Sequence, residues 1–192
     1  MIQSDLSELC QEGRDLVLGE GNPDARLVFV GEAPGGQEER TRRPFVGPAG
    51  QILNEALAAA GLSRDAVWIT NIVKCRPVTP GLGGRLRNRT PTAAEVKHFL
   101  PWLLHELQII EPTAIVALGA TAASALLGRQ VKMTRERGEW FTGRDGIPVM
   151  TTYHPAYLLR RVSDSDQRFA ELASDLRNAA SRTNPEPGRE SH

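Results

Sequence analysis

The hydrophobic positions of the chain fall into four short apolar runs separated by stretches with helical periodicity. The runs are rich in β-branched residues, and none alternates strictly between apolar and polar positions. Such runs are typical of strands that are buried on both faces of a parallel sheet. They predict strands at residues 26–31, 67–73, 113–119 and 147–153.

Apolar residues three and four positions apart predict a helix after each strand. The predicted helices are residues 49–60, 92–110, 120–127 and 166–181. The second begins with a capping box, Thr92-x-x-Glu95, and contains Pro101, which we expect to kink or divide it. The alternation of strands and helices predicts an α/β fold: a three-layer α/β/α doubly wound sheet with a four-stranded parallel core.

The length of 192 residues indicates one domain, placed at residues 1–181. Residues 182–192 lack apolar periodicity, which predicts a disordered tail. The composition, 40% hydrophobic and 24% charged, excludes an intrinsically disordered chain and a membrane protein. No apolar run approaches the ~20 residues that span a bilayer, and the acidic N-terminus is unlike a secretory signal. We expect a cytoplasmic monomer that does not associate with membranes.

The charges are balanced over the whole chain but not along it. Lysine and arginine together number 23, as do aspartate and glutamate, so the net charge is zero. Residues 66–94 nevertheless contain five basic residues and no acidic one, whereas residues 1–39 are strongly acidic. This pattern favours a basic face that could bind nucleic acid, although an ordinary solvated surface would give the same pattern.

Unusual polar or glycine-rich segments follow the predicted strands. The first strand runs into GEAPG (residues 31–35), Asn71 lies within the second, and the third runs into Gly119, Ala120 and Thr121. His154 follows the fourth strand, at a position where a group that titrates near neutrality could act. Ligands of open parallel sheets bind beyond the carboxyl ends of the strands, so these segments predict a site.

Each segment also has a purely structural interpretation. The glycines can form a tight turn, Asn71 can be a core amide with its hydrogen bonds satisfied, and His154 can be structural. The small residues at 119–121 can serve close packing of a helix on a strand. The convergence of all four segments at one edge favours a functional site over four independent structural explanations.

Four segments together, GEAPG, RPFVGPAG, ITNIVKCRP and YHPAYLLRR, resemble the motifs of the uracil-DNA glycosylase superfamily, specifically its family 4 branch. The resemblance extends from about residue 19 to about residue 178. It implies a DNA repair enzyme that flips uracil out of DNA and hydrolyses its N-glycosidic bond. No lysine matches a Schiff-base nucleophile, so the resemblance implies a monofunctional enzyme that leaves an abasic site.

The resemblance also implies roles in binding the flipped base. Phe45 would stack on uracil, Asn71 would read its Watson–Crick edge, and the backbone N–H of Ala33 would contact it. Glu38 is the candidate for excluding a 5-methyl group, and therefore thymine.

Two catalytic residues and a set of DNA contacts follow from the same motifs. Glu32 would orient the catalytic water or polarise the deoxyribose, and His154 would donate a hydrogen bond to uracil O2 as negative charge develops there. Leu158 would wedge into the base stack. The expected phosphate contacts are the helix start at Gly119, Ala120 and Thr121, and the side chains of Lys74, Arg85, Arg87 and Arg160.

The chain departs from the family in its cysteines. Family 4 enzymes usually hold a [4Fe–4S] cluster on four cysteines. Cys10 and Cys75 match the first and third, but Gly13 and Phe99 stand at the other two positions. Two cysteines can neither complete a metal site nor form a disulfide framework. We therefore predict no metal and no cofactor, with apolar packing around Phe99.

A second departure is the segment at residues 78–89, which is longer than the usual family link and predicts a flexible basic loop. A related branch that cross-links to DNA carries an arginine-rich insert with a histidine here. This chain has no histidine between residues 78 and 97, so no covalent trapping is predicted.

The sequence bears on four other functions. A DNA-binding relative without glycosylase activity, and a glycosylase for another deaminated base, remain alternatives. A nucleotide-binding enzyme lacks support, because neither Gly-x-Gly-x-x-Gly nor a Gly-Lys-Ser/Thr loop is present, and a zinc deaminase would need Cys-x-x-Cys.

Overall fold

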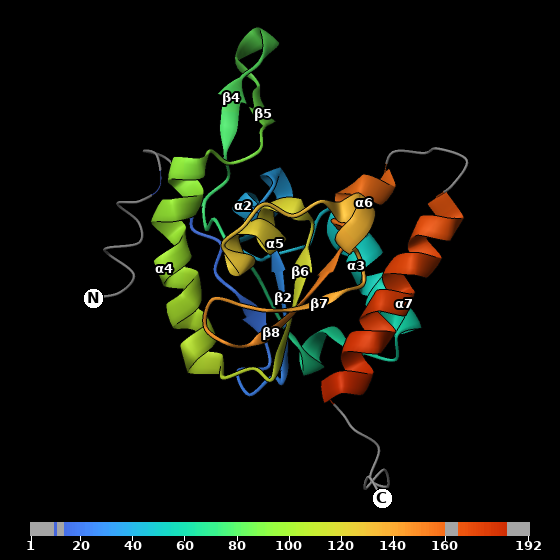
Figure 1. Cartoon of the computed structure of the whole chain (residues 1–192). Coiled ribbons are helices and arrows are strands. Elements are labelled where there is room, and N and C mark those ends of the chain that lie inside the picture. Colours follow the sequence, from blue (N-terminus) through green and yellow to red (C-terminus); the bar gives the residue numbers. More distant parts are fainter. Residues whose placement is uncertain (1–9, 11–13, 160–164, 184–192) are drawn as a thin grey trace, which may run out of the picture.

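A central sheet of six strands organises the protein (Figure 1). The computed structural model describes Cys10, residues 14–159 and residues 165–183. The strand order is β1-β3-β2-β6-β8-β7, with β3, β2, β6 and β8 parallel and the two edge strands antiparallel. This confirms the predicted doubly wound sheet with four parallel central strands. The strands are β1 (Glu20–Gly21), β2 (Leu27–Gly31), β3 (Trp68–Asn71), β6 (Ala114–Leu118), β7 (Trp140–Thr142) and β8 (Pro148–Thr152).

Helices connect the parallel strands, and each of the four predicted helices is confirmed. The helices are α2 (Gly36–Thr41), α3 (Pro48–Ala59), α4 (Ala93–Ile110), α5 (Ala120–Leu127), α6 (Met133–Glu136) and α7 (Ser165–Thr183). The capping box is present, because the Glu95 N–H donates to Thr92 Oγ1 and the Thr92 N–H donates to the Glu95 carboxylate. Pro101 lies inside α4, which continues through it as one helix.

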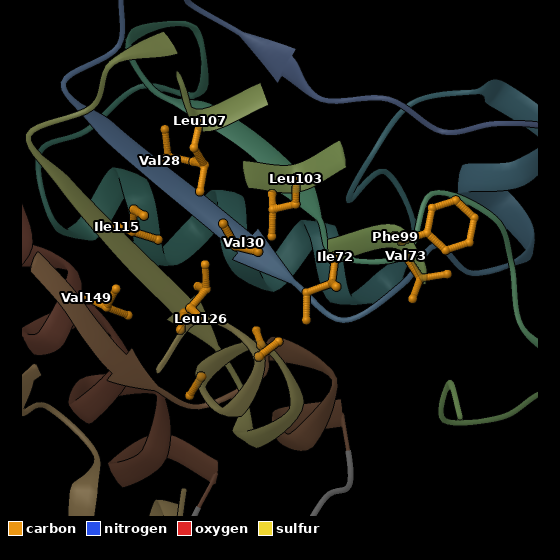
Figure 2. Close-up of a cluster of buried hydrophobic side chains, with 14 of the residues drawn as sticks. Val28, Val30, Ile72, Val73, Phe99, Leu103, Leu107, Ile115, Leu126 and Val149 are labelled. Atoms are coloured by element: carbon orange, nitrogen blue, oxygen red, sulfur yellow. The ribbon is translucent and has the colours of Figure 1, made fainter. Parts of the chain in front are cut away.

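The helices form a layer on each face of the sheet. Buried side chains of α4 and α5 pack on one face in a cluster that includes Phe99, Leu103 and Leu126 (Figure 2). Those of α3 and α7 pack on the other face. Neighbouring residues of β2 alternate between the clusters, with Val28 in the first and Phe29 in the second. Burial on both faces explains the continuous apolar runs of the sequence.

The topology places a crevice between β2 and β6. The chain moves from β2 to β3 in one direction and later from β6 to β8 in the other, so the strand order reverses at the β2–β6 pair. Loops diverge to opposite faces at such a switch point, and ligands bind there beyond the carboxyl ends of the strands. The GEAPG turn after β2 and the start of α5 after β6 therefore flank this crevice.

The segment predicted as a flexible loop forms a β-hairpin. Strands β4 (Val78–Pro80) and β5 (Leu86–Asn88) pair only with each other, joined by the short 3-10 helix η2 (Leu82–Gly84). The Gly81 N–H donates to the Arg85 carbonyl and closes the turn at 2.7 Å. The hairpin (green in Figure 1) projects from the body of the domain on the same side as α2.

The end of the domain differs slightly from the prediction. Helix α7 continues to Thr183, two residues further than expected, and buries this side chain. The rest of the predicted tail, residues 184–192, lies outside the described residues. Among the residues that are described, no helix is long and apolar enough to cross a membrane.

Candidate active site

A pocket of about 500 Å³ opens at the switch point of the sheet. Its lining comes from the turn after β2, the starts of α2 and α3, the end of β3, the base of the hairpin and the turn after β8. The predicted site residues that line it are Glu32, Ala33, Glu38, Phe45, Asn71 and His154. These residues are far apart in the sequence, and the parallel strands bring them to one edge.

Phe45 and Asn71 meet above the end of β2 because residue 31 is glycine. A Cβ atom at Gly31 would lie 2.4 Å from Phe45 Cζ and 2.4 Å from Asn71 Oδ1, so any larger residue would displace both side chains. The Phe45 ring also lies 5.9 Å from the His154 ring, at an interplanar angle of 33°. An aromatic face, an amide and an imidazole therefore border the same space.

The backbone of Phe45 is held in a conformation that is unfavourable for this residue. Its φ angle of 50° lies in the left-handed region, which few bulky residues adopt. The Arg64 guanidinium, from the 3-10 helix η1 (Arg64–Ala66), donates to the Phe45 carbonyl at 3.1 Å and to the Pro44 carbonyl. Helix α3 approaches the Phe45 carbonyl so closely that a Cβ atom at Gly50 would lie 1.9 Å from its oxygen. Surrounding contacts therefore fix the ring before any ligand arrives.

Asn71 presents an unpaired amide oxygen. The residue is only 2% exposed, and its Oδ1 atom has no hydrogen-bond partner among the described residues. A buried polar atom without a partner costs about 1–3 kcal/mol, so it is uncommon unless a ligand completes it. The interpretation of Asn71 as a satisfied core amide does not fit this geometry.

The imidazole of His154 is partly buried, and its lowered pKa keeps it neutral. Burial lowers its pKa from 6.5 to about 4, while the nearby Glu38 carboxylate opposes the shift. The Ala156 N–H donates to Nδ1 at 3.1 Å, which leaves Nδ1 as the acceptor and places the proton on Nε2. Gly119 allows the close approach, since a Cβ there would lie 2.9 Å from His154 Cβ. His154 is therefore a neutral hydrogen-bond donor at the pocket wall.

Glu32 is oriented by the start of helix α5. The Thr121 hydroxyl donates to the Glu32 carboxylate at 2.5 Å, which links the turns after β2 and β6 across the switch point. The Gly119 N–H donates to the Thr152 carbonyl at 2.9 Å, so it is not free for the phosphate contact predicted for it. The Thr121 side chain thus serves Glu32, whereas phosphate binding by the backbone N–H groups of Ala120 and Thr121 stays a prediction.

Glu38 holds two loops of the pocket together. Its carboxylate accepts hydrogen bonds from the N–H groups of Gly35, Val46 and Gly47, at 3.2, 3.1 and 2.7 Å. It therefore fixes the GEAPG turn against the segment that carries Phe45. This positioning role was not anticipated from the sequence. Exclusion of a 5-methyl group by Glu38 stays a prediction.

Lys74 does not lie on the DNA-facing surface predicted for it. Its ammonium is buried and donates to Glu106 Oε2 at 2.5 Å, to Thr70 Oγ1 at 2.7 Å and to the Asn71 carbonyl at 2.7 Å. Burial lowers the pKa of Lys74, and the Glu106 carboxylate opposes this shift. The lysine braces the backbone of Asn71 from inside the protein and has no access to a phosphate.

Leu158 is likewise turned inward. It is 8% exposed and packs in the cluster beneath α3 and α7, whereas its neighbour Leu159 is 46% exposed and lines the pocket. Both belong to the 3-10 helix η3 (Pro155–Leu159), in which successive side chains point about 120° apart. Leu159, and not Leu158, is therefore the leucine of η3 that is exposed at the pocket. Arg160 lies outside the described residues.

The base of the hairpin contributes pocket residues that the sequence did not reveal. Pro77, Asn88 and Arg89 line the pocket, while Arg85 and Arg87 are exposed further out on the hairpin. The Asn-Arg dipeptide at 88–89 could have signalled this, but only the tertiary structure shows that it returns to the pocket rim.

The residues around Cys75 do not fit a four-thiolate cluster. Cys10 and Cys75 are joined to each other by a disulfide, with their Cα atoms 5.7 Å apart. Phe99 is 2% exposed and packs in the same cluster of buried residues as Cys75. Gly13 lies outside the described residues. Among the residues that are described, no group of three or more His, Cys, Asp or Glu could hold a metal. Function without a cofactor stays a prediction.

Comparison with known proteins gives one consistent family. The chain matches the Uracil DNA glycosylase superfamily over residues 18–177. It is 45% identical to the type-4 uracil-DNA glycosylase of Thermotoga maritima over 171 residues, which cover 87% of this chain and 82% of the relative. It is 42% identical to the type-4 enzyme of Pyrobaculum aerophilum, over 77% of this chain and 75% of the relative. The fold matches SMUG2 of Pedobacter heparinus with a TM-score of 0.57 at 12% identity, over 82% of this chain and 77% of that one.

Fold and site together define a doubly wound α/β protein with a pocket at its switch point that is lined by an aromatic ring, an amide and an imidazole. The chain belongs to the uracil-DNA glycosylase superfamily, as the resemblance of its motifs implied.

Proposed function

We propose that this protein is a monofunctional uracil-DNA glycosylase, which flips uracil out of DNA and hydrolyses its N-glycosidic bond. The observation that carries the proposal is the unpaired, buried Oδ1 atom of Asn71, a residue that lines the pocket together with Phe45 and His154. Uracil N3–H would donate to this oxygen, and the Phe45 ring would stack on the base. The ligand would complete the hydrogen bond that the protein leaves unmade.

His154 would stabilise the leaving group. As the bond between N1 and C1′ breaks, its electron pair passes to the base, and the negative charge spreads to O2. The neutral imidazole would donate a hydrogen bond from Nε2 to this oxygen and keep its proton. Such a donor stabilises the anion as a fixed dipole. The departing group is then the uracil anion, and the sugar has oxocarbenium character.

Glu32 would act on the sugar side of the same bond. Its carboxylate, held by Thr121, can stabilise the positive charge on the sugar and orient a water molecule toward C1′. Addition of the water forms the C1′–O bond, and one proton of the water passes to the carboxylate or to solvent. The departed uracil anion takes up a proton from solvent. The products are free uracil and an abasic site. No lysine lines the pocket among the described residues, which supports hydrolysis without strand cleavage.

The DNA-binding surface would surround the pocket mouth. Leu159, in place of Leu158, would fill the space that the flipped base leaves, and Arg85 and Arg87 would contact phosphates. Helix α5 would add a phosphate contact near Ala120. None of these steps involves an iron–sulfur cluster, and we propose that the protein acts as a monomer.

The test is release of uracil from an oligonucleotide by the purified protein, with iron content measured on the same sample. Uracil release by iron-free protein is the expected result. Release of hypoxanthine or xanthine, but not of uracil, would show that the protein is a glycosylase for another deaminated base. Binding of DNA without release of any base would overturn the catalytic proposal in favour of a DNA-binding relative.

A further inference from the structure

The β4–β5 hairpin stands apart from the core, yet its base is fixed at the pocket rim. The Arg89 N–H donates to the Pro77 carbonyl at 3.1 Å, and the Arg89 guanidinium pairs with Glu95 at 2.6 Å. On the other side, Arg76 Nε donates to Asn88 Oδ1 at 2.7 Å. These bonds join the hairpin to the pocket rim and to the start of α4. Its direction is thus set by the domain.

The outer part of the hairpin, unlike its base, carries exposed side chains without ion pairs among the described residues. Leu82 is 86% exposed and Leu86 is 42% exposed, while Arg85 and Arg87 are exposed and form no ion pair within the described part of the chain. Residues 66–94 contain no acidic side chain that could neutralise them. Two free guanidinium groups beside an exposed leucine are complementary to phosphates next to a groove lined with bases.

The length of the hairpin decides which form of DNA it fits. Leu82 lies five positions after Pro77 at the pocket rim. Extended chain at ~3.3 Å per residue reaches roughly 16 Å over that distance. A single strand whose base enters the pocket runs along the rim. The major groove of duplex DNA is about 12 Å wide, so an arm of this length is long enough to span a groove beside the uracil-containing strand.

We propose that this hairpin is a duplex-reading arm, which places Leu82 in a groove and Arg85 and Arg87 on phosphates of the strand opposite uracil. The proposal rests on the proposed glycosylase function and names its substrate class: uracil in double-stranded DNA. Glycines at 81, 83 and 84 suit this role, since Gly83 and Gly84 have φ angles of 67° and 74° and leave the tip free of side-chain bulk beside Leu82.

The experiment compares one uracil-containing oligonucleotide as a single strand and after annealing to its complement. The full-length triple variant Leu82→Ala/Arg85→Ala/Arg87→Ala should lose roughly tenfold or more in kcat/KM on the duplex, since it lacks two phosphate contacts and one groove contact. On the single strand the loss should stay within about twofold, because the opposite strand, whose phosphates the arm is proposed to contact, is absent.

A matched control removes two exposed arginines far from the pocket. Arg26→Ala/Arg177→Ala lowers the net charge by the same amount. Arg26 precedes β2, at the amino ends of the parallel strands, and Arg177 lies on α7. This control variant should change kcat/KM to the same extent on the single strand and on the duplex. Equal losses on both substrates by the triple variant, or no loss on the duplex, would overturn the proposal.

A second measurement separates this proposal from the glycosylase assignment. Equilibrium binding to uracil-free duplex and uracil-free single strand needs no base excision. Weaker duplex binding by the triple variant, with unchanged single-strand binding, supports the arm even if no uracil is released. Equal binding of the wild-type and triple-variant proteins to duplex would contradict the arm even if uracil is released normally.

Discussion

The pocket and the hairpin lie side by side at the same edge of the sheet, but their side chains are held in opposite ways. In the pocket, Phe45 is fixed by Arg64, His154 by the Ala156 N–H, and Glu32 by Thr121. On the hairpin, the ion pairs and hydrogen bonds are at the base, and the outer side chains are exposed.

This difference corresponds to two kinds of recognition. A pocket that must bind one base and stabilise one transition state gains from groups that are already oriented. A surface that binds a charged, deformable polymer gains from long cationic side chains that adapt to it. Changes in the pocket should therefore affect the chemical step, and changes on the hairpin should affect the binding of DNA and its dependence on salt.

The largest effect should come from Asn71→Ala. It removes the amide that would read the base edge, so we expect a loss in kcat/KM of roughly 100-fold or more. Uracil release under single-turnover conditions measures it. Binding to uracil-free DNA should not change. Near-normal release by this variant would show that Asn71 does not read the base.

Lys74→Met should act on stability, not on DNA binding. The change leaves the Glu106 carboxylate without its cation, and the free energy of unfolding should fall by about 3 kcal/mol in urea denaturation. The double variant Lys74→Met/Glu106→Leu should recover part of the loss, because both charges are removed. If the folded Lys74→Met variant showed a changed salt dependence of DNA binding, Lys74 would instead be a phosphate contact.

Burial of His154 should make stability depend on pH. The unfolded chain binds a proton near pH 6.5 and the folded protein only near pH 4, so the unfolded state holds more protons between these values. The contribution of His154 to the free energy of unfolding is therefore fully present above pH 6.5. It is lost as the pH falls toward 4, by about 3 kcal/mol at most. The His154→Gln variant should lack this part of the slope in urea denaturation. Parallel curves for the two proteins would contradict a neutral His154.

Arg64→Ala tests whether the pocket depends on the conformation of Phe45. Freed from the guanidinium, the Phe45 backbone can leave the left-handed region, which holds about 1–3 kcal/mol of strain, and we expect kcat to fall roughly tenfold. Arg43→Ala is the matched control, since both arginines contact Glu20 but only Arg64 bonds to the Phe45 carbonyl. Arg64→Lys should restore part of the activity. Equal effects of Arg43→Ala and Arg64→Ala would show that the ion pairs with Glu20 matter, and not the carbonyl contact.

The smallest effect should come from the Arg85→Ala/Arg87→Ala variant at low salt. The slope of log Kd against log salt concentration for duplex DNA should decrease by about 2, close to one for each lost phosphate contact. At saturating DNA, kcat should be unchanged. An unchanged slope would show that these arginines do not contact phosphates.

Much of the fold could be predicted from the sequence because it depends on local patterns. Continuous apolar runs identified the four parallel strands, and periodicity with the Thr92–Glu95 capping box identified the helices. Since parallel strands end at one edge, the residues that follow them had to converge, which is how Glu32, Asn71 and His154 could be placed together.

Side-chain direction and the fate of irregular segments could not be predicted in this way. Lys74 and Leu158 occupy the expected positions in the chain, yet both point inward, and the segment at residues 78–89 pairs into a hairpin. Arg64 gave no local signal at all, because the carbonyl groups that it binds lie about 20 residues earlier in the chain.

The sequence by itself therefore determined the four central strands, the four main helices, the doubly wound sheet and the residues at its carboxyl edge. Only the tertiary structure decided which of those residues face the pocket, which brace it from inside and which extend toward DNA. The physical reason is that periodicity records whether a position is buried on an element. The direction of a single side chain at the end of that element depends on contacts with segments that are distant in sequence.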